Sequence, residues 1–310
     1  MRRRFFTLAA AICLAVFFLS NCGRKGPLTL APYLNLPAPT GLSASQAKDI
    51  LKLNWSFSGK TQQYFMVERK ENGGAFIEIA DPKTTTVSDL IDPGKEYEYR
   101  ISAVSKANTP GAPANIKVKT IVPPGPPREL GFSILPDTIK LKWTPPITEN
   151  QKVQFKIYKQ IGPGVSEVSG VSGTAAALIT PVPVSENNFA DSPDPLEEVT
   201  YTVLSFVNGP VPCEGDSSSI SIAPDDYVPS KAATPQGAVI ANGVMLVWAP
   251  NPETWVQGYE IYKEENGTFN AVGQRRIPSF LDLGARFGRY RVSALGPVKE
   301  GPPSNILRVR

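Results

Sequence analysis

Three segments of the chain end in a tryptophan that a loop follows; the first two alternate apolar and polar residues, and the third is apolar at every position. They are Leu51-Lys52-Leu53-Asn54-Trp55, Ile139-Lys140-Leu141-Lys142-Trp143 and Val244-Met245-Leu246-Val247-Trp248. Successive side chains of an extended strand point to opposite faces, so this period of two places each tryptophan on one face with the residues two and four before it. The pattern predicts three half-buried β-strands in which Trp55, Trp143 and Trp248 face a core.

The same series of elements follows each of these strands. An aromatic-x-aliphatic strand begins ten to twelve residues after each tryptophan, at Phe65, Phe155 and Tyr259. An apolar-x-Asp step and a strand led by a tyrosine come next. The step ends at Asp89, Asp191 and Asp282, and the later strand begins at Tyr97, Tyr201 and Tyr290. Repetition of one pattern predicts repeated domains of one architecture, whose cores contain the tryptophans and these tyrosines.

Spacing and turn residues divide the chain. Tryptophan and aspartate are 34 residues apart in the first and third repeats and 48 apart in the second, so the second repeat contains an insertion. Proline-rich stretches separate the repeats, and Asn72-Gly73 and Asn266-Gly267 predict hairpin turns. The predicted domains are residues 37–121, residues 127–224 with the insertion near 162–185, and residues 230–310.

At these residues the chain resembles fibronectin type III domains. The strand tryptophan, the aromatic residue of the next strand and the run from Ile91 to Tyr97 (Ile-Asp-Pro-Gly-Lys-Glu-Tyr) all fit that family. The run matches the family's Leu-x-Pro-Gly-x-x-Tyr corner, in which the tyrosine hydroxyl bonds back to the chain. The resemblance implies an all-β fold of tandem antiparallel immunoglobulin-like (fibronectin type III) β-sandwiches. It also implies that Tyr97 is the corner tyrosine, with Tyr201 and Tyr290 as its counterparts.

The first residues have the pattern of an export signal. Three arginines precede the uncharged stretch from Phe5 to Leu19, which is shorter than the about 20 residues that a membrane-spanning helix needs. The following Leu-Ser-Asn-Cys-Gly resembles the lipobox of bacterial lipoproteins. This resemblance implies that residues 1–21 are cleaved off, that Cys22 is acylated, and that residues 22–36 form a lipid anchor and tether. The alternative is an ordinary cleaved signal that releases a soluble protein.

Two further features of the N-terminus bear on location and function. Gly23 stands where the best-known sorting rule for lipoproteins has the aspartate of inner-membrane retention, so by resemblance the protein is delivered to the outer membrane, facing the periplasm. The run from Cys22 to Leu28 (Cys-Gly-Arg-Lys-Gly-Pro-Leu) resembles the start of very short lipoproteins that help mature the lipopolysaccharide translocon. The same start is found on unrelated lipoproteins.

Composition narrows the possible chemistry. The chain has 310 residues, 41% of them hydrophobic, with no histidine and three cysteines. Histidine-based catalytic triads and histidine metal sites are therefore excluded, and we expect no catalytic residues, no metal and no cofactor. If Cys22 is acylated, Cys213 is the cysteine left in the folded part, as a free loop thiol or an intermolecular disulfide. Removing residues 1–21 takes away three arginines and no acids, so the mature chain is almost neutral, which argues against a nucleic-acid partner.

Five apolar residues are candidates for a partner surface. Leu204 and Phe206 fall on the outward face of their strand, where the insertion covers them or a partner binds them. Met245 and Val247 occupy outward positions at which the other repeats have lysine or asparagine. Trp255 follows in a loop, where it caps the edge of the core or offers an exposed ring to a sugar.

These observations predict a non-catalytic envelope lipoprotein that acts as a membrane-tethered binding or spacer module. Its partners would be the membrane, through the lipid anchor, and an envelope protein or polysaccharide. The alternative is an accessory factor for assembly of an outer-membrane machine such as the lipopolysaccharide translocon.

Overall fold

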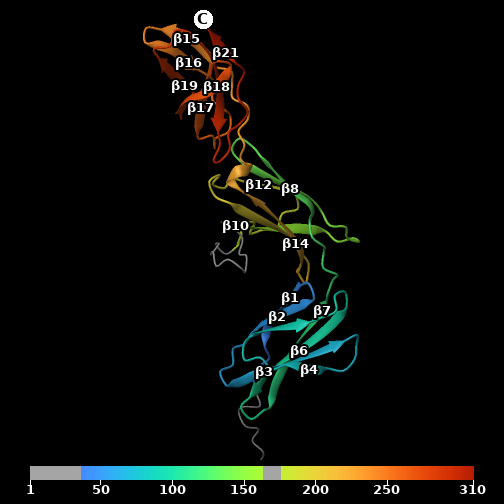
Figure 1. Cartoon of the computed structure of the whole chain (residues 1–310). Helices are drawn as coiled ribbons and strands as arrows, with labels where there is room; N and C mark the ends of the chain where they lie inside the picture. The colour runs from blue at the N-terminus through green and yellow to red at the C-terminus, as the bar shows by residue number, and fades with distance from the viewer. Residues whose placement is uncertain (1–35, 163–175) are drawn as a thin grey trace, which may run out of the picture. The chain divides into compact units, whose positions relative to one another are not determined.

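The computed structural model describes residues 36–162 and 176–310. In this part of the chain the regular structure is β-strand, apart from one 3-10 turn, η2 (Pro224–Asp226) (Figure 1). The predicted all-β class is confirmed. Among the same residues no helix has the length and apolar character needed to cross a bilayer.

The chain divides into two compact units. The first comprises Leu53–Val87 and Tyr97–Lys117 together with the residues up to Ser43. The second comprises Ala44–Lys52, Ser88–Glu96 and Val118–Arg310. The domain boundaries expected from the sequence stay predictions.

The N-terminal strands belong to two sheets. The strands β1 (Thr40–Ala47), β2 (Ile50–Ser56) and β5 (Thr86–Leu90) are neighbours in one of them. The other has the order β4-β3-β6-β7 and consists of β4 (Ile77–Ala80), β3 (Gln62–Glu71), β6 (Glu96–Ser105) and β7 (Pro110–Lys119). Asn72 and Gly73, with φ of 49° and 78°, make the turn after β3 that the Asn-Gly pair predicts.

Residues 128–222, which we call the middle sandwich, form two layers around one core. One layer has the order β12-β9-β8, with β12 (Asn188–Asp191), β9 (Ile139–Thr144) and β8 (Arg128–Ile134). The other has the order β11-β10-β13-β14, with β11 (Ala177–Leu178), β10 (Val153–Ile161), β13 (Val199–Val207) and β14 (Cys213–Ile222). Within the second unit, β14 also pairs in parallel with the end of β1, where Gln46 is opposite Cys213.

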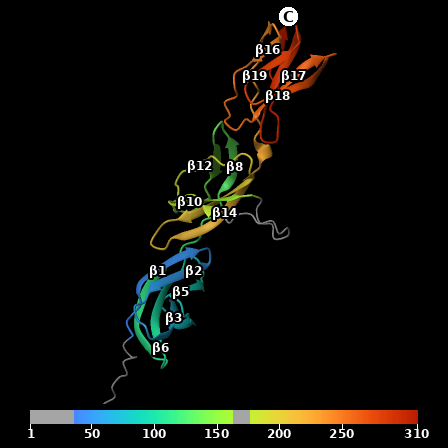
Figure 2. The ribbon, with the colours of Figure 1, turned by 90° about the vertical axis from the view of Figure 1, so that its left-hand side faces the viewer.

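Residues 236–309, the C-terminal sandwich, repeat this arrangement. A sheet of order β15-β16-β19 contains β15 (Gln236–Ile240), β16 (Gly243–Val247) and β19 (Ser279–Leu283). A second, of order β18-β17-β20-β21, contains β18 (Thr268–Arg275), β17 (Gly258–Glu265), β20 (Gly288–Leu295) and β21 (Leu307–Val309). Figure 2 shows β16 and β19 on one side of this sandwich and β17 and β18 on the other. Side chains from both layers, including Leu246, Ile261 and Val292, share one buried cluster.

The strand tryptophans occupy equivalent environments. Trp55, Trp143 and Trp248 are 5%, 2% and 6% exposed. Each contacts the aromatic residue of the next strand edge to face, with ring centroids 5.3, 5.2 and 5.3 Å apart. The backbone amide of each also donates a hydrogen bond of 3.1 Å to the carbonyl of the residue four positions before the repeated aspartate. These acceptors are Thr85, Asn187 and Pro278. The same contacts form three times because the same residues recur at nearly the same spacing.

Candidate binding surface

The outward face of the sheet β15-β16-β19 is mostly apolar, with Gln236 and Ser279, both opposite Val247, as polar members. Residues directly opposite each other on paired strands point to the same side. Met245 is opposite Ala238 on β15 and Leu281 on β19. Two residues before Met245 on β16, Gly243 is opposite both Ile240 and Leu283. Two residues after Met245, Val247 lies on the same side of the sheet. We call these six residues the outer apolar face: Ala238, Ile240, Met245, Val247, Leu281 and Leu283.

Solvent reaches much of this face. The side chains of Leu283, Val247 and Ile240 are 72%, 46% and 40% exposed, and Met245 and Leu281 are half-buried. On the other side of the same sheet, Val244 and Leu246 are fully buried in the core. All four residues of β16 after Gly243 are therefore apolar, although burial in the sandwich accounts only for Val244 and Leu246.

The corresponding face of the middle sandwich is polar. There the outward residues of β9 are Lys140 and Lys142, and both are exposed. They are opposite Ala190 and Asn188 on β12 and Ser133 and Gly131 on β8. The same fold thus forms with lysine at these positions, so the architecture does not require the apolar residues of the C-terminal sandwich. Contiguous exposed apolar residues in proteins mark interaction surfaces.

Leu204 and Phe206 lie outward on β13, as the alternation predicts, but Phe206 is only 7% exposed. Lys156 on the neighbouring strand places its Nζ 4.2 Å from the centre of the Phe206 ring. The same ammonium donates a hydrogen bond of 2.7 Å to Glu214, which is opposite Phe206 on β14. A lysine that is held by a carboxylate therefore covers part of the ring, and Leu204 remains half-buried.

The described end of the insertion lies along the edge of β10. β11 pairs with Tyr158 and Lys159, and Val184 forms a bridge with Phe155. The amide of Ile157 donates a hydrogen bond of 2.8 Å to the hydroxyl of Thr180. This part of the insertion extends the sheet instead of lying over its outer face, and it contributes Ile179 and Val184 to the core of the middle sandwich. Residues 163–175 of the insertion lie outside the described residues.

Trp255 is half-buried, and the ring packs against the core cluster of the middle sandwich. The indole N–H donates a hydrogen bond of 3.2 Å to the carbonyl of Leu135, and the ring meets Tyr227 edge to face at 5.3 Å. Next to it, the amide of Thr254 donates to the carbonyl of Pro136 at 2.7 Å. These contacts hold the indole against the core, which favours the core-edge role over an exposed ring for a sugar.

A cation, an aspartate and a tyrosine form the same cluster in both of the later sandwiches. In the C-terminal sandwich Asp282 accepts hydrogen bonds from Lys263 at 2.8 Å and from the Tyr290 hydroxyl at 2.7 Å. In the middle sandwich Asp191 accepts them from Lys159 at 2.7 Å and from Tyr201 at 2.6 Å. We call these clusters the Lys–Asp–Tyr clusters. They join the sheet that carries the strand tryptophan to the opposite sheet, and both tyrosine rings are fully buried.

These clusters shift the acidity of their members. Burial raises the pKa of Tyr201 and Tyr290, and the hydrogen bond to a carboxylate raises it further because it favours the neutral hydroxyl. Burial alone would raise the pKa of Asp191, but the hydrogen bonds from Lys159 and Tyr201 outweigh it and lower that pKa. The tyrosines are therefore structural groups that stay neutral, which is the reverse of what a catalytic tyrosine base needs.

The third predicted tyrosine of this set is also buried, at 3% exposure. On the paired strands Lys159 is opposite Tyr201 and Lys263 is opposite Tyr290, and each ammonium lies over that ring. In the N-terminal strands the residue opposite Arg69 is Tyr99, which is fully buried, so by register Tyr99 and not Tyr97 is the counterpart of Tyr201 and Tyr290. The guanidinium carbon of Arg69 lies 5.6 Å from the centre of the Tyr97 ring. Sequence reasoning found the aspartate and tyrosine as repeated landmarks but missed the cation and the link between the three. The available signal was a basic residue that recurs in the aromatic-led strand of each repeat.

Cys213 is the first residue of β14 and is fully buried, so the expectation of a loop thiol is wrong. Burial raises the pKa of its thiol to about 11, and the nearby Glu214 adds to the shift. A thiol with this pKa is hardly ionised at neutral pH and is a poor nucleophile. In the described part of the chain no group of three or more acidic or cysteine side chains is placed to hold a metal ion. Cys22 and Gly23 lie outside the described residues.

No model of a known protein family matches the chain. Among solved structures, the chain is 16% identical to the FN1–FN3 domains of chicken CNTN1, over 88% of this chain and 98% of that one, with a TM-score of 0.27. It is 20% identical to a segment of two fibronectin type III domains from chicken tenascin, over 60% of this chain and 98% of that one, with a TM-score of 0.26. The fold is that of tandem fibronectin type III-like β-sandwiches. Its basis is the strand order, the cores and the repeated tryptophan contacts described above.

The middle and C-terminal sandwiches differ in the outward face of the corresponding sheet. In this chain the difference is plain between the lysines of β9 and the apolar residues of β16. The outer apolar face is accordingly the candidate binding surface of the C-terminal sandwich.

Proposed function

We propose that the protein is a non-catalytic binding or spacer module, tethered to the outer membrane through an acylated Cys22, and that the outer apolar face binds an envelope protein. The apolar row formed by half-buried Met245 and exposed Val247 and Leu283 carries this proposal. An interaction surface of this kind needs an apolar centre that excludes water, which these side chains supply. The buried thiol of Cys213 and the neutral tyrosines support a binding role over a catalytic one.

The variant Met245→Lys with Val247→Lys tests the binding surface. It gives β16 the outward lysines that β9 already has, so the sheet is expected to fold. We expect a stoichiometric partner to co-purify with the detergent-solubilised full chain and to be lost with this variant. The matched control, Lys140→Gln with Lys142→Gln, changes the same positions of the middle sandwich and should retain the partner. Equal recovery of the partner with both variants would exclude the outer apolar face.

The run from Cys22 to Leu28 favours a second candidate function, in assembly of an outer-membrane machine such as the lipopolysaccharide translocon. This function depends on residues 24–28 rather than on the C-terminal sandwich. Replacing Arg24 to Leu28 by a Gly-Ser tether of equal length keeps the acylated cysteine and removes the motif. Loss of an assembly partner with this variant, but not with the Met245→Lys, Val247→Lys variant, would support the accessory function.

A further inference from the structure

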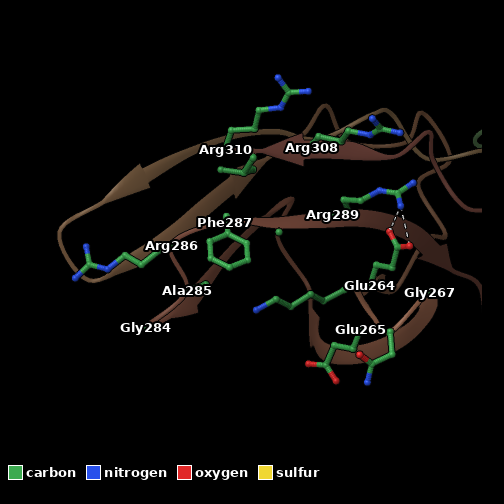
Figure 3. A pocket seen from close by; sticks show the side chains of 14 residues that line it. Glu264, Glu265, Gly267, Gly284, Ala285, Arg286, Phe287, Arg289, Arg308 and Arg310 are labelled. Carbon is green, nitrogen blue, oxygen red and sulfur yellow. Dashed lines mark hydrogen bonds and ion pairs between the residues drawn. The ribbon is translucent and has the colours of Figure 1, made fainter.

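A cavity of about 850 Å³ opens on the C-terminal sandwich, and no residue of the outer apolar face lines it. Its walls are the turn that joins β17 to β18, the loop between β19 and β20, and β21 (Figure 3). Binding sites for small molecules are typically about 300–1,000 Å³. The cavity is therefore large enough for an oligosaccharide segment or a molecule of similar size.

Local backbone geometry fixes both loops. Asn266 and Gly267, with φ of 53° and 85°, form the two-residue turn between β17 and β18. In the other loop Gly284 has φ of 76°, and its amide donates a hydrogen bond of 2.8 Å to the carbonyl of Asn242. A side chain at Gly288 would meet the Tyr290 ring at 2.6 Å, so glycine allows the chain to pass close to that ring. The cavity is thus built by two turns of defined shape.

Positive charge predominates around the cavity. Five basic side chains line it, against two carboxylates, Glu264 and Glu265. Glu264 is committed to Arg289, at 2.7 Å, and Lys263 is committed to Asp282 in the Lys–Asp–Tyr cluster. The remaining basic side chains are exposed and, among residues 36–162 and 176–310, have no hydrogen bond or ion pair. They are Arg286, Arg308 and Arg310.

An exposed phenyl ring lies among these arginines. Phe287 is 74% exposed, and Figure 3 shows its ring near the middle of the view, with Arg286, Arg289, Arg308 and Arg310 around it. Removing a phenylalanine side chain from water is favourable, so a ligand that covers this exposed ring would gain binding free energy. Arginines suit carboxylates and phosphates because the guanidinium donates two parallel hydrogen bonds.

The composition of the lining favours a sugar over other anions. The carboxylate of Glu265 and the amide oxygen of Asn266 are hydrogen-bond acceptors, and an acidic saccharide brings hydroxyl groups as donors. The apolar face of a pyranose ring fits against an exposed phenyl ring. A nucleic acid requires a longer basic stripe than this cavity offers, and an acidic peptide presents carboxylates without the hydroxyls.

We propose that this cavity binds an acidic saccharide, with the carboxylate or phosphate of the sugar held by Arg308 and Arg310, which lie next to each other at β21 (Figure 3), and a sugar ring stacked on Phe287. The inference is independent of the partner proposed for the outer apolar face, because the two surfaces share no residue.

Calorimetry on the full-length protein in detergent tests the proposal with four probes. The acidic saccharides are tetragalacturonate and a phosphorylated glucosamine disaccharide, and the comparison probes are neutral maltotetraose and pentaglutamate. We expect at least one acidic saccharide to bind at least tenfold more tightly than both comparison probes, with an affinity that falls as salt increases. Comparing the carboxylated with the phosphorylated saccharide identifies the acidic group.

Variants connect the binding to the cavity. Arg308→Gln with Arg310→Gln should weaken binding of the acidic saccharide at least tenfold, and Phe287→Ser should weaken it severalfold. Arg276→Gln removes an exposed arginine elsewhere on the same sandwich and should leave the affinity unchanged. The Met245→Lys, Val247→Lys variant should also bind normally, so failure of the two proposals can be told apart. Equal binding of pentaglutamate, absence of binding by both acidic saccharides, or an unchanged affinity in the double arginine variant would overturn the proposal.

Discussion

The Lys–Asp–Tyr cluster of the C-terminal sandwich gives a stability prediction that can be worked out from its contacts. Tyr290→Phe removes the hydroxyl that donates a 2.7 Å hydrogen bond to Asp282 and leaves the ring in place. A hydrogen bond to a charged group contributes about 1.5–3 kcal/mol. Asp282 keeps its hydrogen bond from Lys263, so we expect the lower part of this range, about 1.5–2 kcal/mol.

Hydrogen exchange measured by mass spectrometry on the full chain reports this loss for the C-terminal sandwich alone. Amides of β17 and β20 should exchange about 10- to 30-fold faster, because each 1.4 kcal/mol corresponds to about a factor of ten in the opening equilibrium. Amides of the middle sandwich should be unaffected. The matched control is Tyr262→Phe, which removes an exposed hydrogen bond to Glu300 at 2.8 Å and should change exchange by less than about fivefold. If Tyr290→Phe had no larger effect than Tyr262→Phe, the cluster would not hold the two sheets together.

Four further outcomes are expected. Trp248→Ala should destabilise the C-terminal sandwich by about 3–5 kcal/mol in the same exchange assay, whereas Trp248→Phe should cost less because the buried indole N–H has no hydrogen-bond partner among the described residues. Equal effects of the two substitutions would contradict this. The urea concentration at the unfolding midpoint should fall as the pH rises above about 10, because the tyrosines of the unfolded chain ionise there while the raised pKa of Tyr201 and Tyr290 keeps them neutral in the folded protein. Replacing both tyrosines by Phe should flatten this pH dependence. An unchanged slope would refute the reasoning. The Cys213 thiol should react with a maleimide only after denaturation, and prompt labelling of the native chain would show that it is accessible. Cys22→Ser should move the protein from the membrane fraction to the soluble fraction and abolish palmitate labelling, while retention in the membrane would rule out the lipid anchor.

The cores could be predicted from the sequence because their signal is local. Trp55 and Trp143 end strands in which apolar and polar residues alternate, and that alternation fixes the face that is buried. The strand before Trp248 is apolar throughout, so its buried face follows from its likeness to the other two repeats. The six predicted core residues are buried. The buried Cys213 was misplaced because its segment, Pro-Cys-Glu-Gly-Asp, has the composition of a loop, whereas pairing with β13 makes it a strand.

Features that depend on contacts between distant strands could not be predicted from the sequence pattern. Lys156 covers Phe206 because Glu214 on a third strand holds its ammonium, and no single segment contains that information. Thr180 directs the described end of the insertion to the edge of β10 through one side-chain hydrogen bond. The cavity beside Phe287 forms where two loops and β21 meet, so its residues are scattered through the C-terminal sandwich.

The outer apolar face is tested most directly by placing a photo-crosslinking benzophenone at single positions of the full-length protein in intact cells of the native host. At Val247 the account predicts one discrete crosslinked species, and at Lys142, the equivalent outward position of the middle sandwich, it predicts none. The same yield at both positions, or no product at Val247, would contradict the assignment of this sheet face as the binding surface.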